Sequence, residues 1–109
     1  MISKSKKSGA ETAICPVAKV AEHLGDSCTL LIVRDLMTGA KRFGELEKSL
    51  SPVSSRTLVK KLKALESEGM IVRREFDQHP PRVEYSLTRK GSAFHDVVDA
   101  MRAYGKKYL

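Results

Sequence analysis

The fold of this chain is decided by residues 42–88, which read RFGELEKSLSPVSSRTLVKKLKALESEGMIVRREFDQHPPRVEYSLT. Hydrophobic spacing, with Pro and Gly as punctuation, predicts a helix over 42–50, a tight turn and a second helix over 54–68. Two strands are expected next, over 71–77 and 82–87, joined by a tip that contains two consecutive prolines. Two helices followed by a short hairpin are the parts of a winged helix-turn-helix.

The helix predicted over 54–68 has one cationic and one apolar face. At about 100° per residue, three cations fall within about 40° of one line. These are Arg56, Lys60 and Lys63. Leu58, Leu62 and Leu65 lie on the opposite side, where they would face a protein core. The outward face favours a negatively charged partner, and a hairpin beside it indicates DNA.

Composition limits the class of protein. The chain has 109 residues, of which 41% are hydrophobic, so it fits one small domain with a modest core. Its net charge of +7 favours an anionic partner such as nucleic acid. No apolar run approaches the roughly 20 residues needed to cross a bilayer, and no secretory signal is evident. We therefore expect a cytoplasmic protein without a membrane partner, with a disordered basic arm over 1–12 and a DNA-binding domain over 13–109.

Three more helices are predicted around this unit, over 16–24, 28–38 and 89–107. The expected fold class is thus mainly α with a small β-hairpin. The last helix carries a longer apolar stripe than a small domain needs for its own core, so we expect a homodimer that forms through the terminal helices. The residues expected at that interface are Val17, Val20, Phe94, Val97, Val98, Met101, Tyr104 and Tyr108.

The expected DNA-binding residues come from three segments of the chain: Lys41, Arg42, Ser54, Ser55, Arg56, Thr57, Lys60, Lys61, Lys63, Arg73, Arg74 and Arg82. Arg56 is the candidate for a base contact, because its planar fork can bridge O6 and N7 of guanine. The lysines that follow it in the same helix are expected to contact phosphates. Lys41 and Arg42 are expected to begin a helix, whose first N–H groups favour a phosphate. Arg82 lies at the predicted hairpin tip, where a minor groove would pass.

These assignments have structural alternatives. The lysines of the basic helix also suit a plain solvated face, and Arg73 and Arg74 also suit ion pairs across the hairpin. The partners of such pairs would be Glu75 or Glu84. At the level of function, the alternative is a winged helix that docks an acidic protein partner. An enzyme is not expected, and neither is a metal or a cofactor, because the chain has no phosphate-binding glycine loop, nucleophile–base motif or grouped metal ligands.

The two cysteines, Cys15 and Cys28, call for different interpretations. Cys15 precedes the proline that opens the first helix, and a helix N-terminus stabilises a thiolate. Cys15 is therefore the candidate redox-sensing residue, with an ordinary buried residue as the alternative. Cys28 is expected to be a small core hydrophobe. Neither a permanent disulfide nor a zinc site is expected from the compartment and the spacing.

Several segments are typical of one known family. They are CPV at 15–17, LIVRDL at 31–36, KRFGEL at 41–46, LESEGMI at 65–71 and, most specifically, PPRVEYSLT at 80–88. With these segments the chain resembles the HxlR-type winged helix-turn-helix transcription regulators of bacteria and archaea, from Cys15 to beyond Gly91. The resemblance implies a homodimer that binds an operator as repressor or activator.

The same resemblance bears on both cysteines. Several members of the family sense oxidants or electrophiles with a cysteine at the position of Cys15. The effector of this chain, an oxidant or a small molecule, is left open. Cys28 is a departure, because family members commonly carry Trp at that position, and the chain has no Trp.

Overall fold

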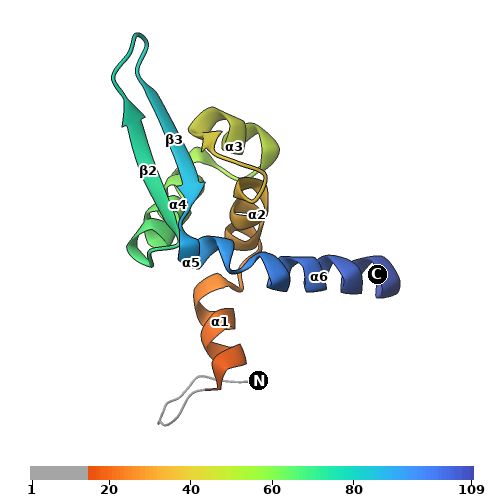
Figure 1. Ribbon diagram of the computed structural model, residues 1–109. Helices are drawn as coiled ribbons and strands as arrows, with labels where there is room; N and C mark the ends of the chain where they lie inside the picture. Colours follow the sequence, from red (N-terminus) through yellow and green to blue (C-terminus); the bar gives the residue numbers. More distant parts are fainter. Residues whose placement is uncertain (1–14) are drawn as a thin grey trace.

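A computed structural model gives the arrangement of residues 15–109, the part of the chain that the structure describes (Figure 1). The helices are α1 (Pro16–Leu24), α2 (Ser27–Leu36), α3 (Phe43–Ser49), α4 (Ser55–Ser67), α5 (Arg89–Ser92) and α6 (His95–Tyr108). The strands are β1 (Lys41–Arg42), β2 (Ile71–Phe76) and β3 (Arg82–Leu87). This confirms a mainly helical fold with a small hairpin. The basic arm expected over 1–12 lies outside the described residues.

One hydrophobic core joins α2, α3, α4 and the sheet. The leucines of α4 point inward as their spacing predicts, with Leu58 fully buried and Leu62 and Leu65 each 2% exposed. From α2, Ile32 and Val33 are fully buried. Burial of an aliphatic side chain contributes about 1.5–3 kcal/mol to folding. The rotation of α4 that buries its leucines leaves its cationic face outside the core.

The hairpin forms as predicted, from two antiparallel strands of six residues each. Ile71 lies opposite Leu87 near the helical body, and Phe76 lies opposite Arg82 next to the proline-containing tip. The two strands differ in how far they follow the core, since β3 contributes Tyr85 from its middle and β2 contributes only its inner end. Ile71 is 1% exposed, whereas the outer residues of β2 are mostly exposed.

A third strand, β1, pairs with β3, so that the strand order is β1–β3–β2. Lys41 lies opposite Tyr85 and Arg42 opposite Glu84. The sequence analysis placed Lys41 and Arg42 at the start of a helix, and for this detail it was wrong, because α3 begins at Phe43. A strand of two residues has no periodic signal of its own, and pairing with a distant segment decides its conformation.

Side-chain caps fix where α2 and α4 begin. Ser54 accepts a hydrogen bond from the backbone N–H of Thr57 at 3.1 Å, as predicted. Asp26 caps α2 in the same way, accepting from the N–H of Thr29 at 3.1 Å. Gly69 follows the C-terminal end of α4 at a φ of +76°, a conformation that favours glycine.

The single helix predicted over 89–107 is in fact two, α5 and α6, separated by a turn at Ala93 and Phe94. The N–H of Thr88 donates to the carbonyl oxygen of Met70 at 2.9 Å, which fastens the start of α5 to the turn after α4. A Cβ on Gly91 would lie 2.1 Å from the same oxygen, so α5 packs closely there. Phe94 then enters the core at 8% exposure. The apolar spacing continues through both helices, and for that reason it did not reveal the turn.

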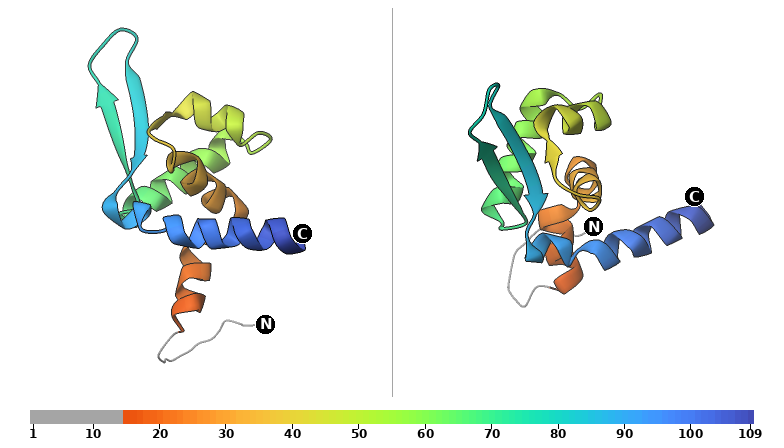
Figure 2. Two further views of the ribbon diagram at one scale, coloured as in Figure 1. Left: turned by 45° about the vertical axis from the view of Figure 1, so that its right-hand side comes forward. Right: turned by 45° about the horizontal axis from the view of Figure 1, so that its top comes forward.

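Three segments project from the helical body, namely the β2–β3 hairpin, α1 and α6 (Figure 1, Figure 2). The radius of gyration is accordingly 15.7 Å, above the roughly 13 Å expected for a compact domain of this length. The hairpin runs beside α4 and continues past it, which places the two elements on one side of the molecule. Within residues 15–109, no helix combines the length and the apolarity needed to cross a membrane.

Candidate nucleic-acid interface

The exposed face of α4 carries three of the cations that the sequence singled out. Arg56, Lys60 and Lys63 are all exposed, on the side of the helix opposite its buried leucines. The hairpin lies beside this helix and its tip extends past the helical body (Figure 1). A cationic helix next to a projecting hairpin has the shape to enter a major groove while the hairpin contacts the neighbouring backbone or minor groove.

The N-terminal end of α4 presents exposed hydroxyl groups, those of Ser54, Ser55 and Thr57. The hydroxyl of Ser54 donates to Oγ1 of Thr57 at 3.1 Å. The hydroxyl of Ser55 donates to a carboxylate oxygen of Glu47, a residue of α3 that the sequence analysis did not select. Nothing in the sequence indicated this contact, because the turn between the two helices brings the groups together. Because its proton is engaged by Glu47, the Ser55 hydroxyl is available only as a hydrogen-bond acceptor for a DNA base or a water molecule.

Lys61 does not share the cationic face of α4. Its Nζ lies 3.5 Å from Oδ2 of Asp26, and its side chain is 31% exposed. At about 100° per residue it lies about 140° from Arg56 around the helix. Lys61 thus neutralises the carboxylate that caps α2, and we leave it out of the proposed interface.

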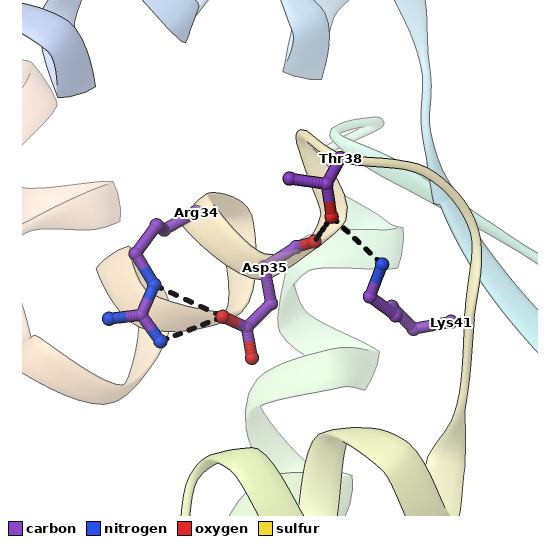
Figure 3. A network of polar contacts seen from close by, with 4 residues as sticks. All are labelled: Arg34, Asp35, Thr38 and Lys41. Atoms are coloured by element: carbon purple, nitrogen blue, oxygen red, sulfur yellow. Dashed lines mark hydrogen bonds and ion pairs between the residues drawn. The ribbon is translucent and has the colours of Figure 1, made fainter.

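Lys41 is also directed differently from the prediction. Its Nζ donates to Oγ1 of Thr38 at 2.9 Å, and that hydroxyl donates to the backbone oxygen of Asp35 at 3.0 Å (Figure 3). Arg34 completes the network by donating to Oδ1 of Asp35 from Nε at 3.0 Å and from Nη2 at 2.7 Å. The ammonium group of Lys41 therefore secures the turn between α2 and β1.

The start of α3 already holds a carboxylate. Glu45 accepts a hydrogen bond from the backbone N–H of Arg42 at 2.8 Å. The phosphate that the sequence analysis expected at this helix start would meet that negative charge. Arg42 itself is exposed, and its place in β1 brings it to the hairpin instead.

Three arginines, Arg42, Arg74 and Arg82, lie on the same face of the sheet as Glu84 and Phe76, and we call these five residues the wing cluster. Nε of Arg82 lies 3.2 Å from Oε2 of Glu84, and the Arg82 guanidinium lies 4.8 Å from the centre of the Phe76 ring. Arg74 lies over the same ring at 5.7 Å. Arg42 and Arg74 are the partners of Glu84 on the two adjacent strands. Arg82, 31% exposed, is thus held between a carboxylate and an aromatic face.

Arg73 belongs to the other face of the hairpin. Its Nη1 lies 3.6 Å from Oε1 of Glu75, and both side chains are well exposed. The sequence analysis allowed Arg73 to pair with Glu75 or Glu84, and Arg73 pairs with Glu75. A pair so exposed contributes little to stability, about 0–1 kcal/mol.

Val59 is a further residue of the exposed face of α4 that the sequence analysis did not select. It is 38% exposed and lies at the edge of the cationic face, about 40° beyond Lys63 around the helix. The sequence could have indicated this residue, because Val59 does not fall on the leucine stripe, and an apolar residue off that stripe does not point into the core.

Away from the cationic surface, α1 and α6 expose apolar side chains. Six of the eight residues expected at a dimer interface are between 40% and 75% exposed in the protomer. They are Val17, Val20, Val97, Met101, Tyr104 and Tyr108. The other two, Phe94 and Val98, are each 8% exposed and belong to the core of the protomer itself.

The two cysteines have different environments. Both are free thiols, and Cys15 is exposed at the start of α1, directly before Pro16. This contradicts the buried alternative for Cys15 within the protomer. Cys28 is buried as expected, and this burial, together with the charge of Asp26, raises the pKa of its thiol against the opposing effect of Lys61.

One group of metal-ligand residues occurs at the start of α6, among the described residues. His95, Asp96 and Asp99 each place a ligand atom within 4.8 Å of the others. Asp99 is already paired, with Nδ1 of His95 at 3.0 Å and with Nη1 of Arg102 at 2.9 Å. All of these side chains are exposed, and ion pairs along one helix account for their arrangement.

Known proteins share both the sequence and this fold. Residues 23–109 match the family model described as HxlR-like helix-turn-helix. An uncharacterized HTH-type transcriptional regulator from Synechocystis sp. is 38% identical over 96 residues, which are 88% of this chain and 71% of that protein. The structure of a MarR-family transcriptional regulator from Porphyromonas gingivalis W83 is 32% identical with a TM-score of 0.84, over 93% of this chain and 99% of that one. The redox regulator HypR, solved in its oxidized form, is 30% identical with a TM-score of 0.82, over 87% and 98% of the two chains.

Proposed function

The chain belongs to the HxlR-like helix-turn-helix family of transcriptional regulators, and on that premise we propose that it binds a two-fold operator in double-stranded DNA as a homodimer. The observation that carries the proposal is the exposed cationic face of α4 beside the projecting hairpin. In the proposed complex α4 lies in the major groove with its N-terminal end toward the bases. Arg56 contacts a guanine, and Lys60 and Lys63 contact phosphates.

The wing cluster supplies the second set of contacts in this proposal. Arg74 and Arg82 are the hairpin arginines that Phe76 and Glu84 hold in place. Ordered arginines lose less conformational entropy on binding than free ones. Next to a helix in the major groove, the hairpin reaches the adjacent minor groove or its phosphates.

The apolar stripe of α6 supports the dimer. Val97, Met101, Tyr104 and Tyr108 fall within about 60° of one line at about 100° per residue, and all are exposed in the protomer. The helix extends away from the body, so that within residues 15–109 no other helix or strand lies against its last turns (Figure 2). A helix of this length is marginal alone in water, and packing against a second copy would stabilise it.

Cys15 is the proposed oxidant-responsive residue. It is exposed, it stands at the start of a helix, and that helix carries part of the proposed dimer interface. A peroxide would oxidise its thiolate to a sulfenic acid. One oxygen atom of the peroxide is transferred to the sulfur, and the rest of the peroxide is released as water or an alcohol. A change at this position can alter how the two protomers, and hence the two α4 helices, are placed.

Equilibrium DNA binding across a range of salt concentrations tests the function. A duplex selected from random DNA should bind with an affinity that falls linearly with salt on a logarithmic scale, with a slope of about 0.9 per phosphate contact. The selected sites should contain two symmetric halves about 10–10.5 base pairs apart. If no duplex is retained, or if binding does not depend on salt, the proposal fails, and an acidic protein partner becomes the better explanation for the cationic face.

Mass spectrometry of the thiols after mild peroxide treatment tests Cys15. The expected product is oxidised Cys15 with Cys28 still reduced, because burial protects the second thiol. The same treatment should change the DNA affinity of the wild-type protein and leave that of Cys15→Ser unchanged. Cys15 would not be the sensor if it stayed reduced while other residues oxidised.

A further inference from the structure

The outward face of α4 is bordered by an apolar side chain, that of Val59, which lies between the cations and the buried leucines around the helix. At about 100° per residue, Val59 lies about 60° from Arg56 and about 40° from Lys63 around the helix. Its neighbour Leu58 is fully buried, whereas Val59 is 38% exposed. Val59 is also the fifth residue of α4, within the N-terminal half that approaches the bases in a helix-turn-helix complex.

The position of Val59, rather than its exposure, is what requires an explanation. Single exposed apolar residues are common on protein surfaces. Valine is, however, a poorer helix former than the lysines and arginine around it, and more than a third of its surface stays exposed. A phosphate gains nothing from an aliphatic side chain. The base-edge group that such a side chain does recognise in a major groove is the C5-methyl group of thymine.

We propose that Val59 reads the methyl group of a thymine in the operator, and this inference rests on the proposed function. Val59 follows Arg56 by three residues, which corresponds to about 4.5 Å along the helix. Successive base pairs are about 3.4 Å apart. The thymine is therefore expected within one or two base pairs of the guanine that Arg56 contacts, and the two side chains together select that short sequence.

Replacement of thymine by deoxyuridine tests the contact, because it removes the methyl group and leaves the hydrogen-bonding groups and the protein unchanged. Each thymine of a duplex selected by the wild-type protein is replaced in turn, symmetrically in both halves. At one position the replacement should weaken wild-type binding by about fourfold for each half-site, the effect of about one buried methyl group. Val59→Ala should bind the thymine and uracil duplexes equally well at that position.

A matched variant is available in the hairpin. Val72 on β2 is 41% exposed, close to the value for Val59, and Val72→Ala removes the same atoms. That variant should remain as sensitive to uracil as the wild-type protein. Thermal unfolding of both variants establishes that they are folded.

Three results would overturn the inference. In the first, the wild-type protein binds uracil and thymine duplexes equally well at every position. In the second, Val59→Ala remains as sensitive to uracil as the wild-type protein. In the third, the selected operator contains no thymine near the guanine proposed for Arg56. In all three, DNA binding itself persists and the proposed function stands. Failure of the wild-type protein to retain any duplex would instead overturn the proposed function, and the inference with it.

Discussion

Asp26 connects α2 and α4 through one carboxylate. It caps α2 by accepting from the N–H of Thr29 at 3.1 Å and from the hydroxyl of Thr29 at 2.6 Å, and it lies 3.5 Å from Nζ of Lys61 on α4. Partial burial acts to raise the pKa of Asp26, but the two hydrogen bonds and the charge of Lys61 outweigh it and hold the pKa below its ordinary value. Because the pKa is lower in the folded state, the ionised group stabilises the fold above the ordinary Asp pKa, and this contribution is lost as the pH falls through the lowered pKa.

Asp26→Ala should therefore lower the free energy of unfolding by about 1 kcal/mol at neutral pH, the usual cost of losing a helix cap. Asp26→Asn keeps a good cap and should cost less. Urea denaturation at several pH values measures both effects. The gap between the wild-type protein and Asp26→Asn should narrow as the solution is acidified below about pH 4. A gap that stays constant with pH would show that the charge of Asp26 contributes nothing.

In the proposed complex Arg56 is the residue that reads the identity of a base pair. Arg56→Ala should weaken binding to a selected operator by about 1–3 kcal/mol and relax the preference at one base pair in each half-site. Filter binding against the operator, its single-base variants and random DNA measures this. An equal loss on operator and random DNA would mean that Arg56 contacts only phosphate.

Lys60, one helical turn further along the same face, provides the comparison for Arg56. Lys60→Ala should lower the affinity for all sequences alike and reduce the slope of the salt dependence by about 1. A slope that did not change would remove Lys60 from the interface.

At the scale of single elements, the hairpin depends on Glu84 to orient its arginines. Glu84→Gln removes the charge and keeps the shape, so Arg82 loses the ion pair of 3.2 Å that fixes it. The wing cluster then carries more positive charge, but the Arg82 side chain is less ordered. We expect the ratio of operator to random-DNA affinity to fall by about fivefold, which corresponds to about 1 kcal/mol for a partly exposed pair.

Glu75→Gln is the matched control for Glu84→Gln. It makes the same change in the same hairpin, at a more exposed ion pair of 3.6 Å with Arg73, and should leave the ratio unchanged. Binding of both variants to operator and random duplexes at one salt concentration gives the comparison. A ratio that is the same for Glu84→Gln and the wild-type protein would show that the wing cluster does not orient Arg82.

At the scale of the whole molecule, the protomer exposes apolar surface on the two helices that project from it. Met101, 48% exposed, lies in the middle of the α6 stripe. Met101→Glu would bury a charge in the proposed dimer and should shift the protein from dimer to monomer in sedimentation experiments. Two-fold operator binding should weaken with it, because the two half-sites would no longer be held together.

Ala103→Glu introduces the same side chain on the same helix, about 120° from the stripe, at a residue that is also exposed. It should remain dimeric. Far-UV circular dichroism of both variants shows whether α6 stays helical. If Met101→Glu sediments like the wild-type protein, the interface lies elsewhere.

Several features of this protein follow from the sequence alone. The two faces of α4, its cap at Ser54, the hairpin and the inward leucines were all predicted and are all present. Each depends on residues that are close along the chain, whether through helical spacing, a cap to the third residue, or a turn that joins consecutive strands. The exposed face of α4 was predictable for the same reason.

Other features were decided only when distant segments came together. These are the pairing of β1 with β3, the turn that divides α5 from α6, the partners of the Lys41 and Lys61 ammonium groups, and the wing cluster around Glu84. The same local pattern was compatible with either outcome at each of these positions. The choice was made by cross-strand pairs, by the close packing of Gly91 on Met70 and by charges on neighbouring elements, and such interactions exist only after the chain has folded.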